Sequence, residues 1–121
     1  MSISDIAEFN EGNNTHNREW TPGTTNEITI NIVDLTDTTP ETQTVKYFKK
    51  KGNCSGFVIR PAGDNLTITE VNVGTEKYLN GDPLSVAVGT AFSWIKRMSA
   101  SVTQIKIKCA STSTHIKILV I

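Results

Sequence analysis

The chain has 121 residues, 12 basic and 12 acidic side chains and no net charge at neutral pH. That length fits one domain with its own core, and the balanced charge argues against nucleic acid as a partner. Apolar runs are only a few residues long, which excludes a membrane-spanning helix. The acidic start MSISDIAEFNEGNN lacks the apolar segment of a secretory signal peptide, so we expect none.

The composition favours β structure. The chain holds 17 Thr, 13 Ile and 9 Val, whereas Leu and Ala together number 11. Branching at Cβ restricts a side chain in a helix but packs well on a pleated strand. We therefore expect an all-β protein.

Charge is unevenly divided along the chain. Residues 1–45 hold eight acids and one base, whereas residues 46–121 hold four acids and eleven bases. Two interpretations stay open. The acidic segment folds against its own basic partner, or it docks on the basic face of a neighbouring copy.

The first 26 residues are polar and rich in Asn, Thr and Glu, which is typical of an arm outside the core. Ile3, Ile6 and Phe9 recur at intervals of three and favour a short amphipathic turn. Trp20 is expected to anchor the arm. The predicted organisation is an acidic arm over 1–26 and one β-domain over 27–121.

After residue 26, alternating apolar and polar residues predict seven or eight short strands. Ile28, Ile30 and Ile32 form the clearest series, and Asp37–Pro40 ends it. A change of parity between Ile68 and Val71 predicts a β-bulge or a bend. Residues 91–98 fit either a strand or one helical turn. The other expected strands cover 44–50, 56–60, 65–73 with a continuation through Gly74 to 79, 84–88, 102–109 and 115–121.

Turns every eight to fourteen residues favour a single antiparallel β-sandwich over 27–121, following the extended N-terminal arm. A jelly roll and an immunoglobulin-like Greek key both fit this spacing. No segment supplies the helices that a parallel α/β sheet needs.

No catalytic motif occurs in the chain, so we expect a protein that is not an enzyme and has no cofactor and no metal. Cys54 and Cys109 are expected to be buried free thiols. Neither His16 nor His115 has a partner at a metal-ligand spacing. Four acids in or near loops could offer oxygen ligands to calcium, but they lack the EF-hand pattern. They are Asp34, Asp37, Asp64 and Asp82.

Two clusters have both a binding and a structural interpretation. Lys49, Lys50 and Lys51 could grip phosphates or could protect a sheet edge from aggregation. Four aromatic residues could form a sugar-stacking platform or could pack in the core and anchor the arm: Trp20, Tyr47, Tyr78 and Trp94.

Three stretches carry a resemblance to a known group of proteins: GFVIRPAGDNLTITEVN, PLSVAVGTAFSWIKRM and SVTQIKIKCASTSTHIKILVI. They resemble small β-sandwich proteins of tailed-bacteriophage virions, which include capsid decoration, head-fibre and small tail proteins. The resemblance implies a virion protein assembled in the host cytoplasm. It also implies a homo-oligomer bound to the major capsid protein or another virion protein, and a trimer is the favoured oligomeric state.

The functional hypothesis is therefore a capsid decoration or accessory protein that binds a repetitive surface through its arm and sheet faces. The alternative is a carbohydrate- or receptor-binding module, such as one at a phage tail, with a surface glycan as partner. The candidate partner-binding residues are Ile3, Ile6, Phe9, Trp20, Lys49, Lys50 and Lys51.

Overall fold

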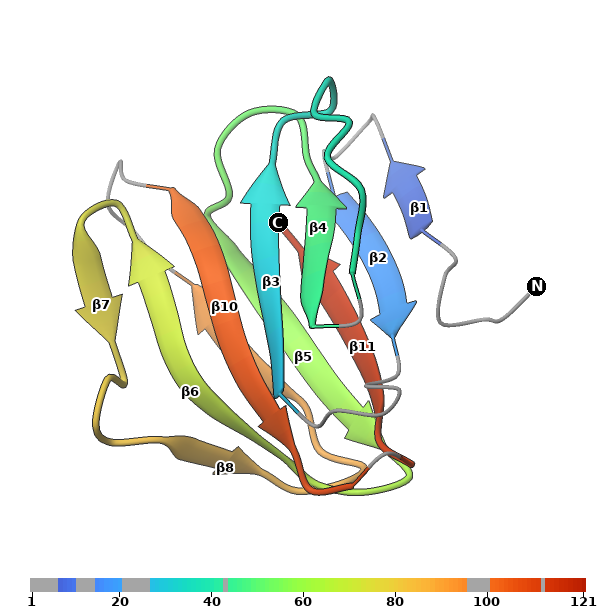
Figure 1. The fold of residues 1–121 in the computed structure, drawn as a ribbon, viewed down its shortest axis with the longest axis vertical. Coiled ribbons are helices and arrows are strands. Elements are labelled where there is room, and N and C mark those ends of the chain that lie inside the picture. Colours follow the sequence, from blue (N-terminus) through green and yellow to red (C-terminus); the bar gives the residue numbers. More distant parts are fainter. Residues whose placement is uncertain (1–6, 11–14, 21–26, 43, 96–100, 112) are drawn as a thin grey trace.

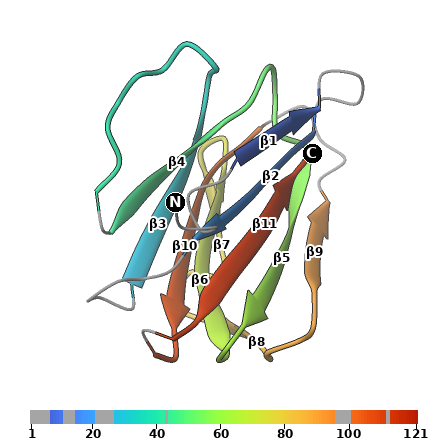
Figure 2. The same ribbon diagram turned by 90° about the vertical axis from the view of Figure 1, so that its right-hand side faces the viewer.

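A computed structural model describes the backbone of residues 7–10, 15–20, 27–42, 44–95, 101–111 and 113–121, and side chains from residue 27 to 94 and after 100. Eleven strands in two stacked sheets make up the fold, so the expected all-β sandwich is confirmed (Figures 1 and 2). Within these residues no helix is long and apolar enough to cross a membrane.

Sheet A has the strand order β1-β2-β11-β5-β9. All its neighbours pair antiparallel, and the C-terminal strand β11 lies in the middle, between β2 and β5. Its strands are β1 (Ala7–Asn10), β2 (Thr15–Trp20), β5 (Gly56–Ala62), β9 (Phe92–Ile95) and β11 (His115–Val120).

Sheet B has the order β4-β3-β10-β6-β7, and β8 pairs with β6 beside its first residues. The strand β10 lies in the middle, between β3 and β6. Its strands are β3 (Glu27–Val33), β4 (Val45–Lys49), β6 (Leu66–Val73), β7 (Glu76–Tyr78), β8 (Leu84–Val86) and β10 (Val102–Cys109).

The pair β3–β4 departs from the antiparallel expectation, because these two strands run parallel (Figure 1). For two consecutive strands to run parallel, the chain between them must return to the end of the sheet at which the first strand began. The chain between the two strands makes that return, and in Figure 2 residues 34–42 swing out beyond β3 and β4 on the side away from sheet A. We call the described part, residues 34–42, the crossover loop.

The bulge predicted from the parity change in β6 is confirmed. The register moves from Lys106↔Glu70 to Ile107↔Ile68, so Thr69 is the extra residue. Past this point the side chains of β6 exchange faces. Glu70 therefore lies on the outer face of the sheet, where it is largely covered, and Val71 points into the core.

Two strand predictions needed correction. The segment 72–79 is not one continuation of β6, because the chain turns at Gly74, whose φ is 60°, and returns as the separate strand β7. Nine strands therefore lie after residue 26 instead of seven or eight. The ambiguous segment 91–98 is a strand over Phe92–Ile95.

The core lies between the sheets and is built mainly from β-branched side chains, as the composition indicated. Ile116, Ile118 and Val120 of sheet A are fully buried and face Ile28, Ile30 and their neighbours in sheet B. Burying a side chain of this kind contributes about 1.5–3 kcal/mol. The core also contains Phe48, Phe57 and both cysteines.

Part of the N-terminal arm is integrated into the fold. The strands β1 and β2 form an antiparallel hairpin, and β2 pairs with β11 along sheet A. Phe9 lies in β1, so the helical turn proposed for it is wrong, whereas Ile3 and Ile6 lie outside the described residues. The domain boundary at residue 26 stays a prediction.

Candidate interaction surface

The outer face of sheet B is the most organised polar surface among the described residues. It consists of the residues that alternate with the buried ones, and they line up in rows across the strands. One row runs Glu27–Lys108–Thr67–Ser85 and the next runs Val45–Thr29–Lys106–Glu70. A third row joins Tyr47, Asn31, Gln104, Asn72 and Lys77.

In the third row, three amide side chains are joined by hydrogen bonds. Asn72 donates from Nδ2 to Oε1 of Gln104 over 2.8 Å, and Gln104 donates from Nε2 to Oδ1 of Asn31 over 2.8 Å. Each bond restricts the rotamers of two half-buried side chains. We call Asn31, Gln104 and Asn72 the amide ladder.

Glu70 connects the amide ladder to the second row. Its Oε2 accepts from Nδ2 of Asn72 at 3.1 Å and lies 3.4 Å from Nζ of Lys106. The Glu70 side chain is 10% exposed and that of Lys106 is 44% exposed. Burial raises the pKa of Glu70 and is the largest single effect. Hydrogen bonds from Asn72 and Lys106, with nearby positive charge, outweigh it and hold the pKa below its ordinary value.

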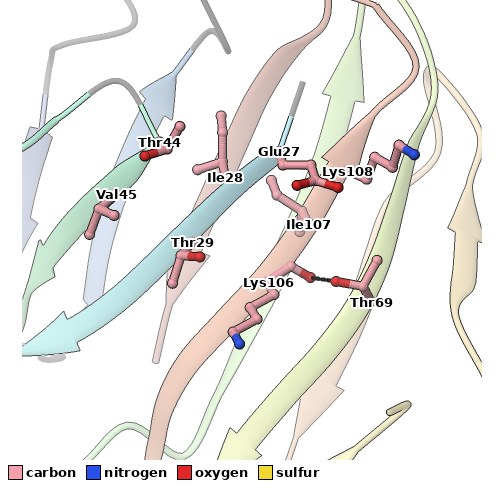
Figure 3. Close-up of a pocket in the computed structure, with 9 residues that line it drawn as sticks. All are labelled: Glu27, Ile28, Thr29, Thr44, Val45, Thr69, Lys106, Ile107 and Lys108. Carbon is pink, nitrogen blue, oxygen red and sulfur yellow. Dashed lines mark hydrogen bonds between the residues drawn. The ribbon is translucent and has the colours of Figure 1, made fainter. Parts of the chain in front are cut away.

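A groove of about 280 Å³ opens on this face beside the ladder (Figure 3). At about 30 Å³ per molecule it has room for roughly nine waters. Lys106 and Lys108 line it from β10, and Oγ1 of Thr69 donates to the Lys106 carbonyl over 3.1 Å. The other lining residues are Glu27, Ile28, Thr29, Thr44, Val45 and Ile107.

A second hollow, of about 570 Å³, lies on the other side of Lys108. It is bounded by β6, β8 and the end of β10, and Asn65 at its margin accepts from the Val88 amide at 2.8 Å. Because both hollows share Lys108, this ammonium group has access to ligands on two sides.

The crossover loop seals the outer edge of β4. Oγ1 of Thr42 accepts from the Val45 amide at 3.0 Å, and Oε2 of Glu41 accepts from the Tyr47 amide at 2.9 Å. The Thr42 amide also donates to the Val45 carbonyl. Edge strands with unpaired backbone groups invite pairing with other chains, so these bonds block one route to aggregation.

The loop also fixes two carboxylates. Oδ1 of Asp34 accepts from the amide and the hydroxyl of Thr36, both at 3.0 Å, and Oδ1 of Asp37 accepts from the Thr39 amide at 2.8 Å. The bonds from the amide and the hydroxyl of Thr36 lower the pKa of Asp34, and the bonds from the hydroxyl and the amide of Thr39 lower that of Asp37. Both side chains are therefore charged down to acidic pH.

The three lysines of the predicted basic cluster do not share one environment. Lys49 ends β4 and is exposed, as is Lys51. Lys50 is only 2% exposed and donates from Nζ to the Lys51 carbonyl over 3.2 Å. Burial lowers the pKa of Lys50. Of the cluster, only Lys49 and Lys51 are accessible to a partner.

The predicted aromatic residues do not form one platform. Tyr78 and Trp94 contact each other edge to face, with ring centroids 5.4 Å apart, where β7 of sheet B approaches β9 of sheet A. Tyr47 lies apart from them on β4. Trp20 and Phe9 lie in strands whose side chains are outside the described part.

Both cysteines are buried and free, as expected. The Cys54 carbonyl accepts from the Val102 amide at the start of β10, whereas Cys109 ends that strand. At about 3.3 Å per residue they lie roughly 20 Å apart, too far for a disulfide. Burial raises the pKa of the Cys54 thiol, and that of Cys109 to about 11.

Among the residues that the structure describes, no three His, Cys, Asp or Glu side chains come together as a metal site. The four acids that could serve as calcium ligands lie in three separate places. Asp34 and Asp37 lie in the crossover loop, whereas Asp64 follows β5 and Asp82 lies in the turn after β7.

The amide ladder could not be recognised from the sequence. Its members come from β3, β6 and β10, and the hydrogen bond between Gln104 and Asn31 joins residues 73 positions apart. The sequence signal that could have indicated it is an Asn or Gln side chain at an outward-facing position in each of these three strands. No protein-family model, curated protein or solved structure matches this chain.

Proposed function

We propose that this chain is a non-enzymatic structural protein of a virion, a capsid decoration or accessory protein that assembles on a repetitive protein surface. The observation that carries the proposal is the outer face of sheet B, where Asn31, Gln104 and Asn72 are held by one another across three strands. Side chains fixed before binding lose little conformational entropy on contact. A prearranged polar face therefore suits recognition of a rigid protein surface.

The division of charge supports an assembly role. Acidic residues gather in the first 45 positions and basic ones in the rest, while the strands of the two segments interleave. Glu27 is opposite Lys108 in sheet B, and Glu19 is opposite Lys117 in the register of sheet A. This interleaving places some opposite charges next to each other within the chain. The crossover loop and several lysines stay available to a partner.

The virion assignment is tested by mass spectrometry on virus particles purified from a culture of the organism that carries this sequence. We expect the chain in the particles at a fixed ratio to the capsid protein. Its absence from intact particles that are made while the chain is expressed would overturn the assignment.

The role of the N-terminal arm is tested by light scattering on the full chain and on a chain that starts at Thr24. We expect an oligomer for the full chain, with a trimer as the favoured state, and a smaller species after truncation. Circular dichroism must show that the shorter chain still folds, because truncation removes β2 from the edge of β11.

A glycan-binding module is the second candidate. It is favoured by Tyr78, which is 36% exposed and held against Trp94, since aromatic faces suit the apolar faces of sugars. A glycan array with the full chain and with Tyr78→Ala and Tyr47→Ala variants tests it. Binding that either substitution abolishes would support this candidate, and an empty array would remove it.

A further inference from the structure

Two oppositely charged features lie on the same side of the molecule without meeting within one chain. The first is the exposed crossover loop, with Asp34, Asp37 and Glu41 and no basic residue. The second is the groove of Figure 3, with Lys106 and Lys108 on its wall. Figure 2 shows the loop standing clear of sheet B.

The acidic end of the loop has a fixed shape. The Asp37 amide donates to the Asp34 carbonyl over 3.1 Å and closes a turn, which holds the two Cα atoms within about 7 Å of each other. Each carboxylate uses its Oδ1 for a bond to a threonine within the loop. The carboxylates lie on an exposed loop, and an ionised carboxylate has further lone pairs that can accept from a partner.

The groove presents positive charge at the matching spacing. Lys106 and Lys108 stand two residues apart on one face of β10, which puts their Cα atoms about 7 Å apart. Lys108 is exposed, and the Lys106 side chain keeps 44% exposure beside Glu70. The Cα atoms of the two aspartates and those of the two lysines are separated by similar distances, and the flexible lysine side chains can turn so that each ammonium group meets one carboxylate.

The loop cannot occupy the groove of its own chain. Glu41 and Thr42 bond it to the outer edge of β4, through the Tyr47 and Val45 amides. The groove lies across β4 from that edge, toward β3 and β10. The basic side chain that acts on the pKa of Asp37 is Lys49, at the end of β4, not a lysine of the groove.

The geometry points to a second copy of this chain as the occupant: the Asp34–Asp37 turn of one copy docks in the Lys106–Lys108 groove of the next. Each copy offers one loop and one groove, so the loop–groove contact repeats from copy to copy and forms a closed symmetric oligomer when the rotation between neighbours closes. This inference rests on the proposed assembly role and names the contact between copies.

The test measures the mass of the full chain by analytical ultracentrifugation over a range of concentrations. The first variant is Asp34→Asn/Asp37→Asn, because an Asn side-chain oxygen can still accept the bonds from Thr36 and Thr39. The second is Lys108→Gln, which leaves Lys106 with Glu70. We expect each to raise the dissociation constant of the oligomer at least about tenfold.

A charge exchange makes the test specific. With Asp34 opposite Lys108 in the contact, Asp34→Lys and Lys108→Glu should each weaken association, whereas both together in one chain should restore part of it, because the exchanged charges again pair. The matched control is Arg60→Glu on sheet A, an exposed residue that lies opposite Lys117 in register. We expect this control to associate like the original chain.

Three results would overturn the inference: a chain that is monomeric at every concentration, variants of the loop and groove that associate normally, or a control that dissociates as they do. Each variant is first shown to be folded by circular dichroism. A monomeric chain that is still present in purified virus particles would refute this contact and leave the proposed function standing.

Discussion

Asn72 and Gln104 are joined through Nδ2 and Oε1 at 2.8 Å, and they sit directly opposite each other between two register shifts of the β6–β10 pair. One shift accommodates Thr103 on β10 and the other accommodates Thr69 on β6. The strands are thus offset on both sides of this pair, while the pair itself is in register. The two amides fix the alignment of the outer face at the point where the sheet is most irregular.

Substitution of Gln104 by Ala removes the middle of the amide ladder. Two hydrogen bonds are lost, but the half-buried partners regain water, so we expect a loss of about 1 kcal/mol in the free energy of unfolding. Urea denaturation followed by circular dichroism measures it. Ser93→Ala, on an exposed position of sheet A, should leave stability unchanged. Equal midpoints for Gln104→Ala and the original chain would contradict a stabilising ladder.

Stability should fall in acid partly because of Glu70. Its pKa is lower in the folded chain than its ordinary value of 4.5, so its contribution is complete above pH 4.5 and disappears as the pH falls through the folded pKa. Urea midpoints measured from pH 7 to pH 3 test this. Glu70→Gln should show a shallower decline than the original chain, and parallel curves would exclude Glu70 as a source of the decline.

Gly63 has a φ of 82°, and a Cβ added there would collide with the Ser113 carbonyl oxygen. Gly63→Ala should therefore cost about 3 kcal/mol or more, from the left-handed backbone and the clash together. Gly81 is the matched control, since its φ is 85° and nothing lies within 4 Å of an added Cβ. Gly81→Ala should cost only about 1–2 kcal/mol. Thermal unfolding of both variants distinguishes clash from backbone strain.

Neither thiol should react in the folded protein. Burial raises the pKa of Cys54 and of Cys109, the latter to about 11, so the reactive thiolate is scarce at pH 8 and inaccessible. A colorimetric thiol reagent should detect almost no reaction until guanidinium unfolds the chain, and then two thiols. Rapid reaction of one thiol under native conditions would show that its strand opens locally.

The sequence predicted the strands well, because residues 28–32, 102–109 and 115–121 follow a simple alternation of buried and exposed positions. It also located the bulge, since Ile68 and Val71 cannot both face the core without an extra residue between them. The parallel pairing of β3 with β4 was out of reach, because local patterns define strands and say little about which strands are neighbours.

The candidate site was harder to predict for the same reason. Asn31, Asn72 and Gln104 are ordinary outward residues in their own strands, and only the assembled sheet brings them together. Lys50 shows the opposite case: three consecutive lysines suggested one exposed patch, but Lys50 continues the alternation of β4 and is buried, as Phe48 is two residues earlier.

The order of strands within the two sheets also determines when this protein can fold during its synthesis. The central strand of sheet B is β10 and that of sheet A is β11, and they are the last two strands of the chain. The pairs β1–β2, β3–β4, β5–β9 and β6–β7 can form earlier. Only β10 and β11 join them into complete sheets, as in the bond between Asn31 and Gln104, whose partners are 73 positions apart. The ribosome must therefore release nearly the whole chain before either sheet can close. Until then the nascent chain exposes β-branched segments without partners, which is the stage at which chaperones act on such chains.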